Sequence, residues 1–264
     1  MIADGGFIPE NVARRFCQGQ IFGIGSTVRQ FIANFNSGKP WYECGPASAG
    51  NGALMRIAPM VIPHVVAGTE NLWVDTALSA MITHNDAGSI SACLTFVYML
   101  RQLLVMEKPP QSEWWPETYA CIARDLEGET RYRPRGGTLK DKFEGPIWKM
   151  VQDQVTEAYS RSLSVKEACS WWYSGAYLLE TVPSVIYILM RHGHEPEEAI
   201  VRAVNDTKDN DTIAAIVGAA VGALHGKGAI PNRWIQNLSG RTTDRDDGKV
   251  FDLIQKAKNK FWLT

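Results

Sequence analysis

The sequence predicts an all-α fold from three observations. Apolar residues recur at intervals of three and four along most of the chain, which places them on one face of a helix. No segment shows the sustained alternation of apolar and polar residues that marks a half-buried strand. Proline opens, and glycine follows, several of the periodic segments, as is usual at the two ends of a helix.

Length and composition limit the organisation of the chain. With 264 residues, of which 45% are hydrophobic and 21% charged, the chain can bury a full core, and we expect a single domain over residues 1–264. A net charge of −1 gives no electrostatic footprint for nucleic acid. The N-terminus lacks the basic and apolar regions of a signal peptide, and apolar stretches such as residues 213–224 are too short to span a bilayer. We therefore expect a cytoplasmic protein with no membrane or nucleic-acid partner.

The cysteines carry no recognisable motif. They are odd in number and far apart, and none of them forms a pair with the short spacing of a zinc or redox site. We expect five ordinary reduced thiols.

The N-terminal part of the chain contains four predicted helices. Pro9 can open a helix over residues 10–18. Helical spacing of apolar residues predicts the next helices over residues 27–36, 72–82 and 87–105. The last of these is long and mostly apolar, so we expect it at the centre of the core.

Residues 108–145 form a predicted loop-rich excursion, with an exposed loop over residues 126–137. Arg131, Arg133 and Arg135 alternate in this loop. They would either reach toward a phosphate or form a solvated basic surface, and we favour the second interpretation. After the excursion, helices are predicted over residues 146–160, 165–172, 185–191 and 195–204, from residue 211 onward, and over 250–262.

Small residues recur every four positions in the helix that starts at residue 211. Ala214, Gly218, Gly222 and Gly226 form one bare face. Glycine costs a helix about 1 kcal/mol relative to alanine. The repetition therefore predicts that another helix packs very closely on this face.

The start of the same helix carries the most informative motif. Asp209 and Asp211 are followed directly by Thr212, and an apolar helical run begins there. Carboxylate and hydroxyl oxygens are ligands that suit Mg²⁺, Mn²⁺ or Ca²⁺. Free backbone N–H groups at a helix N-terminus can also hold a phosphate. The alternative is simple helix capping, for which aspartate and threonine are favoured residues.

A glycine-rich segment supplies a second motif. Gly50 and Gly52 flank Asn51, so the backbone could approach a ligand closely there. Arg56 could fork onto a carboxylate or phosphate, and His84 lies at the junction of two predicted helices. The alternatives are a turn that enters a helix, an Arg56 held in a structural ion pair, and a structural histidine.

Three motifs, at residues 50–59, 83–84 and 209–219, resemble in order and spacing those of the ADP-ribosylglycohydrolase family. Residues 177–182 resemble that family's tyrosine-bearing helix, and the similarity runs from residue 12 to residue 238. The resemblance implies a compact multi-helix orthogonal bundle with two Mg²⁺ or Mn²⁺ ions in a central cleft. It implies hydrolysis of the N- or O-glycosidic bond between ADP-ribose and a side chain, with an ADP-ribosylated protein or an ADP-ribose-containing small molecule as substrate.

The resemblance also implies roles for individual residues. It makes Asp209, Asp211 and Thr212 metal ligands, with both aspartates catalytic. Tyr177 would contact the ribose or the acceptor side chain. The diphosphate and ribose side of the cleft would be formed by Gly50, Asn51, Gly52, Met55, Arg56 and His84.

The sequence departs from the family pattern at one point. The family's early Thr-Asp-Asp-Thr motif, which supplies its other metal ligands, is absent, and the only adjacent aspartates are Asp246 and Asp247 in a polar C-terminal segment. Two hypotheses follow: a metal-dependent hydrolase, or a truncated, catalytically inactive ADP-ribose-binding module or half-site that needs a partner segment. A structural role without a ligand is the third hypothesis. Truncation would expose an apolar surface, which a homodimer would cover.

Overall fold

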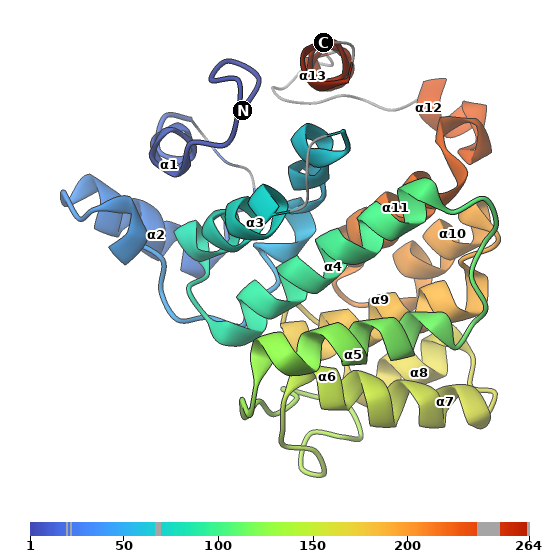
Figure 1. The fold of residues 1–264 in the computed structure, drawn as a ribbon. Coiled ribbons are helices and arrows are strands. Elements are labelled where there is room, and N and C mark those ends of the chain that lie inside the picture. The colour runs from blue at the N-terminus through green and yellow to red at the C-terminus, as the bar shows by residue number, and fades with distance from the viewer. Residues whose placement is uncertain (20, 22, 67–69, 237–248, 263–264) are drawn as a thin grey trace.

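The computed structural model describes residues 1–264 except residues 20, 22, 67–69, 237–248 and 263–264. Asp246 and Asp247 therefore lie outside the described residues. The described part is an α-helical bundle without a strand (Figure 1), as the sequence predicts.

Thirteen α-helices are present in the described residues. The first seven are α1 (Pro9–Phe16), α2 (Ser26–Asn36), α3 (Glu70–Thr83), α4 (Ala87–Val105), α5 (Trp114–Glu127), α6 (Ile147–Met150) and α7 (Thr156–Ser160). The others are α8 (Val165–Trp172), α9 (Leu178–His192), α10 (Pro196–Asp206), α11 (Asn210–His225), α12 (Asn232–Gln236) and α13 (Lys249–Phe261). A π-helical turn, Val151–Val155, joins α6 to α7, and short 3₁₀ turns cover Trp41–Glu43, Leu54–Arg56, Ala58–His64 and Lys227–Ala229.

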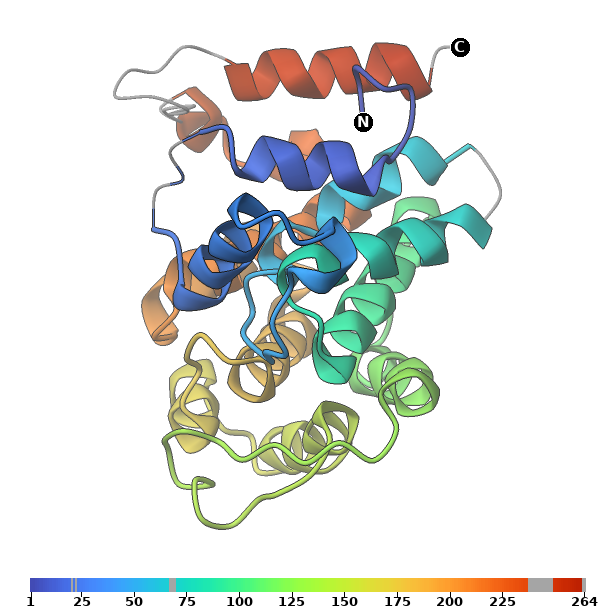
Figure 2. The same ribbon diagram turned by 90° about the vertical axis from the view of Figure 1, so that its left-hand side faces the viewer.

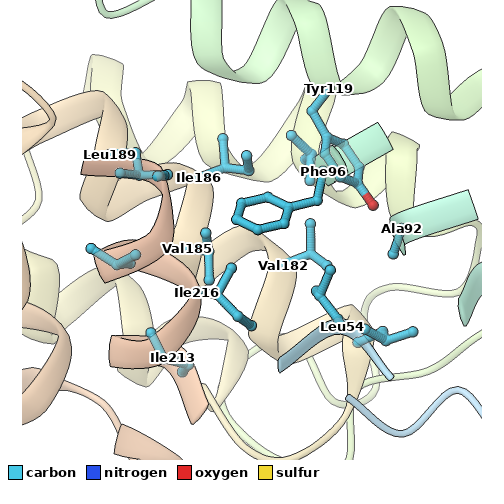
Figure 3. Packing of buried hydrophobic residues seen from close by; sticks show 14 of the residues in the cluster. Leu54, Ala92, Phe96, Tyr119, Val182, Val185, Ile186, Leu189, Ile213 and Ile216 are labelled. Atoms are coloured by element: carbon cyan, nitrogen blue, oxygen red, sulfur yellow. The ribbon is translucent and has the colours of Figure 1, made fainter. Parts of the chain in front are cut away.

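Helix α4 lies at the centre of the core and contacts α3, α5, α9 and α11. Its Phe96 points toward Val182 and Val185 of α9 and Ile216 of α11 (Figure 3). By length and composition alone α4 could cross a membrane, so the expectation that every apolar stretch is too short was wrong. Its apolar character has another explanation, because most of the helix is buried inside the protein.

A smaller cluster joins the N-terminal helices to the bundle. Ala13 of α1, Phe31 of α2, Cys44 and Ile82 of α3 are completely buried together. This cluster holds α2 and the residues before it against α3. The N-terminal segment thereby becomes one wall of the site described below.

Helices α1 and α13 lie at the same end of the molecule, although they come from opposite ends of the chain (Figure 2). Trp262, which follows α13, donates a hydrogen bond from Nε1 to the Ile62 carbonyl over 2.8 Å. Along α13 only Ala257 is buried, and Leu253 and Ile254 are more than half exposed.

Two helices differ from their predicted extents. Residues 108–145, predicted to be rich in loops, include the helix α5. Its Pro116 does not break the helix, because it lies in the first turn, where a missing backbone N–H costs no intrahelical hydrogen bond. Helix α9 begins at Leu178 rather than at residue 185, and Pro183 lies inside it. Every residue from Leu178 to Met190 is buried, so packing outweighs the one hydrogen bond that the proline removes.

The predicted close packing on the glycine face of α11 is wrong. A Cβ atom built on Gly218 or on Gly222 meets no atom of another described residue within 4 Å. Gly226 lies just beyond the helix with φ +73, where glycine is the favoured residue. The buried face of α11 is the neighbouring one, which carries Ile213, Ile216, Val217, Ala220 and Val221.

Candidate functional site

All ten residues that the sequence singled out line one cleft of about 550 Å³. They are Gly50, Asn51, Gly52, Met55, Arg56, His84, Tyr177, Asp209, Asp211 and Thr212. The volume lies within the usual range of small-molecule sites, about 300–1,000 Å³. A larger hollow of about 790 Å³ runs along α7, α8 and the 138–142 segment, and none of these ten residues lines it.

Three segments that are distant in sequence meet at the cleft. Ala49 accepts a hydrogen bond from the backbone of Leu178 over 2.9 Å, and Gly50 pairs with Tyr177 as an antiparallel bridge. The backbone N–H of Asp209 donates to the Ser174 carbonyl over 3.1 Å. The glycine-rich segment and the starts of α9 and α11 are therefore fixed to one another by main-chain bonds.

Asn51 joins the same three segments through its side chain. Its Nδ2 donates to Asp209 Oδ2 over 2.5 Å and to Thr181 Oγ1 over 2.9 Å. Thr181 Oγ1 in turn donates to the Gly175 carbonyl over 2.8 Å. Asn51 is only 6% exposed, so both amide hydrogens are used inside the protein and hold the Asp209 carboxylate in place.

Helix capping does not account for the two aspartates. Asp209 occupies the N-cap position of α11, but its side chain makes no capping hydrogen bond and faces Asn51 instead. Asp211 is exposed in the first turn, and its carboxylate has no hydrogen-bond partner in the described part of the chain. Thr212 Oγ1 lies 3.8 Å from the sulfur of Met55.

These residues do not fit two resident cations by themselves. Two carboxylates and one hydroxyl line this part of the cleft, and the described residues contain no group of three His, Cys, Asp or Glu side chains that could hold a metal. Mg²⁺ and Mn²⁺ need about six oxygen ligands. Asp209, Asp211 and Thr212 could supply only part of a coordination shell.

The two glycines beside Asn51 make room for His84. A Cβ on Gly52 would lie 2.8 Å from His84 Cε1, and one on Gly50 would lie 3.4 Å from Nε2. Burial, and then the positive charge of Arg56, lowers the pKa of His84 to about 4. His84 therefore enters the cleft wall as a neutral imidazole at neutral pH.

Arg56 is tied to the C-terminal turns of α3. Its Nη2 donates to the Ser79 carbonyl and to Thr83 Oγ1, both over 2.8 Å, and its Cζ lies 5.0 Å from the centre of the Phe16 ring. Its hydrogen-bond partners in the described residues are hydroxyl and carbonyl oxygens, so the structural ion pair that was the alternative interpretation is absent from this part of the chain. Thr83 Oγ1 also lies 2.9 Å from His84 Nδ1, which links Arg56 to the histidine.

Tyr177, which pairs with Gly50, also lines the cleft. Burial, followed by the nearby charge of Asp86, raises the pKa of Tyr177 to about 12, so its hydroxyl is neutral. The Cζ atom of Arg135 lies 5.0 Å from the centre of the Tyr177 ring. The Tyr132 and Tyr177 rings pack edge to face, with their centres 6.1 Å apart.

Sequence reasoning missed Arg135 as a wall of the cleft. Its backbone N–H donates to Glu180 Oε1 over 2.6 Å, and its Nη2 pairs with Oε2 over 3.1 Å. Glu180 is completely buried in α9. A glutamate inside an apolar helix needs a charged or hydrogen-bonding partner, and this requirement was the available signal for Arg135.

Comparisons with known proteins identify the family of the chain. The family model described as ADP-ribosylglycohydrolase matches residues 1–260. The chain is 24% identical over 225 residues to the ADP-ribosylarginine hydrolase Tri1 of Pseudomonas putida, covering 84% of this chain and 51% of Tri1. It is 26% identical over 209 residues to the ADP-ribosylhydrolase ARH3 of Homo sapiens, covering 74% of this chain and 55% of ARH3. It thus spans about half the length of these two relatives.

A solved structure described as an ADP-ribosylglycohydrolase-related protein complex has the same fold. The TM-score is 0.68 at 22% sequence identity, over 97% of this chain and 74% of the other. At this identity the likeness concerns the fold alone. The match of the family model over nearly the whole chain shows that the protein belongs to the ADP-ribosylglycohydrolase family.

Proposed function

We propose that the cleft binds the ADP-ribose unit of a modified protein side chain, or of an ADP-ribose derivative, and that the chain takes part in hydrolysing the glycosidic bond that holds it. The relatives Tri1 and ARH3, which are described as hydrolases of this kind, support the proposal. The observation that carries the proposal is the hydrogen bond from the Asn51 amide to the Asp209 carboxylate. This bond holds the carboxylate in the cleft, and the carboxylate makes no capping hydrogen bond to α11.

The cleft residues have distinct proposed tasks. The charge of Arg56 and the neutral imidazole of His84 suit the diphosphate side, because one supplies positive potential and the other a hydrogen-bonding group. The exposed carboxylate of Asp211 can accept a hydrogen bond from a water molecule and orient it toward the bond to be cleaved. The Asp209 carboxylate, fixed by Asn51, would accept a hydrogen bond from a ribose hydroxyl.

The proposed cofactor is Mg²⁺ or Mn²⁺. Asp209, Asp211 and Thr212 would supply part of its coordination, and further ligands would have to come from outside the described residues. This incomplete donor set supports a second candidate function, namely ADP-ribose binding without turnover. The cytoplasmic location, the single domain and the homodimer stay predictions.

The test is release of ADP-ribose from peptides modified on arginine or on serine, with and without Mg²⁺. We expect Asp209→Asn and Asp211→Asn each to lower turnover by about 100-fold or more, as for loss of a catalytic carboxylate. Asp125→Asn, at an exposed position on α5 outside the cleft, is the matched control. Unchanged turnover in both cleft variants would contradict the site, and binding of ADP-ribose without any turnover would favour the second candidate.

A further inference from the structure

A second hollow adjoins the cleft. It has a volume of about 410 Å³ and shares Arg135, Ala176 and Asp209 with the cleft. Its other walls are Tyr173, Gly175 and Lys208. A ligand that fills the cleft as far as Asp209 could therefore continue into this hollow.

The floor of the hollow is a strained turn. Tyr173 and Ser174 have φ values of +85 and +49, in the left-handed region that residues other than glycine rarely adopt. Ser174 Oγ accepts a hydrogen bond from the Lys208 backbone over 3.2 Å, and the Ser174 carbonyl accepts one from Asp209. The strained turn thus fixes the backbone that carries both Lys208 and Asp209, and strain of this kind tends to be kept at functional sites.

Close contacts hold the Tyr173 ring in position. A Cβ on Gly136 would lie 2.3 Å from Tyr173 Cδ2, and one on Gly175 would lie 3.0 Å from Cδ1. The Lys208 ammonium lies 3.7 Å from the centre of the same ring. The ring therefore serves as a fixed platform that presents the ammonium at the edge of the hollow.

Two cations and one carboxylate line the hollow, and the guanidinium of Arg135 is paired with the buried Glu180, so Lys208 supplies the unbalanced positive charge. Lys208 is exposed and forms no ion pair with a carboxylate within the described residues. The loop that carries Arg135, residues 128–146, has five basic and three acidic side chains, whereas the chain as a whole has a net charge of −1. The Asp209 carboxylate is the acidic group of the lining, and Asn51 holds it on the cleft side.

We propose that this hollow is the acceptor subsite, which receives the protein segment that bears ADP-ribose, and that Lys208 and Arg135 favour segments with acidic residues beside the modified side chain. The inference rests on the proposed function, because it places the acceptor beside the ADP-ribose cleft, at the residues that the two spaces share. Lys208 makes the contact with the acidic residues of the segment that determines this preference. Arg135, whose charge is balanced by Glu180, offers its remaining N–H groups at the boundary between the cleft and the hollow.

The test uses two hydrolysis-resistant analogues of an ADP-ribosylated peptide, one with two glutamates beside the modified residue and one with two glutamines. Calorimetry would compare their dissociation constants, and that of free ADP-ribose, for the wild type, Lys208→Gln, Lys208→Arg and Lys140→Gln. Lys140 is exposed on the loop that carries Arg135 but does not line the hollow, so Lys140→Gln is the matched control. Rim charges typically change affinity modestly, so we expect roughly a fivefold preference for the glutamate peptide at low salt.

Lys208→Gln should bring this preference close to one while leaving the affinity for free ADP-ribose unchanged. Lys208→Arg and Lys140→Gln should keep the preference, and added salt should reduce it. If free ADP-ribose binds and the wild type does not distinguish the peptides, or Lys208→Gln retains the preference, the subsite is wrong and the proposed function stands. If neither peptide nor ADP-ribose binds, both are overturned.

Discussion

His84 joins the chemistry of the cleft to the stability of the protein. Its folded pKa of about 4 lies below the value of about 6.5 for an unfolded histidine, so below pH 6.5 the unfolded chain binds a proton that the folded chain excludes. The stabilisation from neutral His84 is fully present above about pH 6.5 and is lost as the pH falls toward 4. At about 1.4 kcal/mol per pKa unit, it is worth up to about 3 kcal/mol.

The expected result is that His84→Gln flattens the fall in unfolding free energy between pH 6.5 and pH 4. Urea unfolding at a series of pH values measures this slope. The control is His194→Gln, at an exposed histidine that does not line the cleft. A His84→Gln variant with an unchanged slope would show that the histidine is not held neutral by its surroundings.

At the same scale, residue types could be predicted from the sequence but their partners could not. Asn51, His84, Tyr177 and Asp209 were identified because motif and spacing mark them. The partners of Arg56 depend on the packing of the C-terminal turns of α3, which bring hydroxyls and a carbonyl to its guanidinium. That of Arg135 depends on a glutamate 45 positions further along the chain.

Among the elements, helix α11 shows where periodicity fails as a predictor. Its glycines recur as they do in tightly packed helix pairs, yet the space beside them is open. Apolar spacing gives the face of a helix that is buried, but it does not say whether a face of small residues has a neighbour. Long helices such as α4 were located correctly because their pattern repeats over many residues, whereas a proline near a helix start obscured α5 and α9.

The open face of α11 gives a prediction at the scale of the element. Gly218→Ala should stabilise the protein by about 0.5–1 kcal/mol, because alanine is the better helix former and its methyl group meets no atom. Gly137→Ala is the contrasting variant: its φ is +74 and its Cβ would lie 2.4 Å from the Trp171 carbonyl, so it should destabilise the loop and the protein. Chemical denaturation measures both. A Gly218→Ala variant less stable than the wild type would indicate that another chain or segment packs against this face.

In the whole molecule, the cleft lies where segments from very different parts of the sequence meet. The wall residues come from the region before α2, the glycine-rich segment, the α3–α4 junction, the loop before α6 and the starts of α9 and α11. Order along the chain allowed the family to be identified, but the enclosed space depends on the complete packing of the helices. For this reason Asn51, at the crossing of three segments, ties the fold to the site.

Because the cleft is built from so many segments, a ligand bound there should stabilise the folded chain as a unit. ADP-ribose at 100 times its dissociation constant should raise the free energy of unfolding by about 2.7 kcal/mol, seen as a higher midpoint of thermal unfolding. If Asp209, Asp211 and Thr212 hold a cation, Mg²⁺ should add a further increase that Asp211→Asn removes, since Asp211 has no other partner in the described residues. An increase with ADP-ribose that ignores Mg²⁺ would favour a site that works through the Asn51 and His84 side alone. No increase with either ligand would contradict the proposal that this cleft holds ADP-ribose.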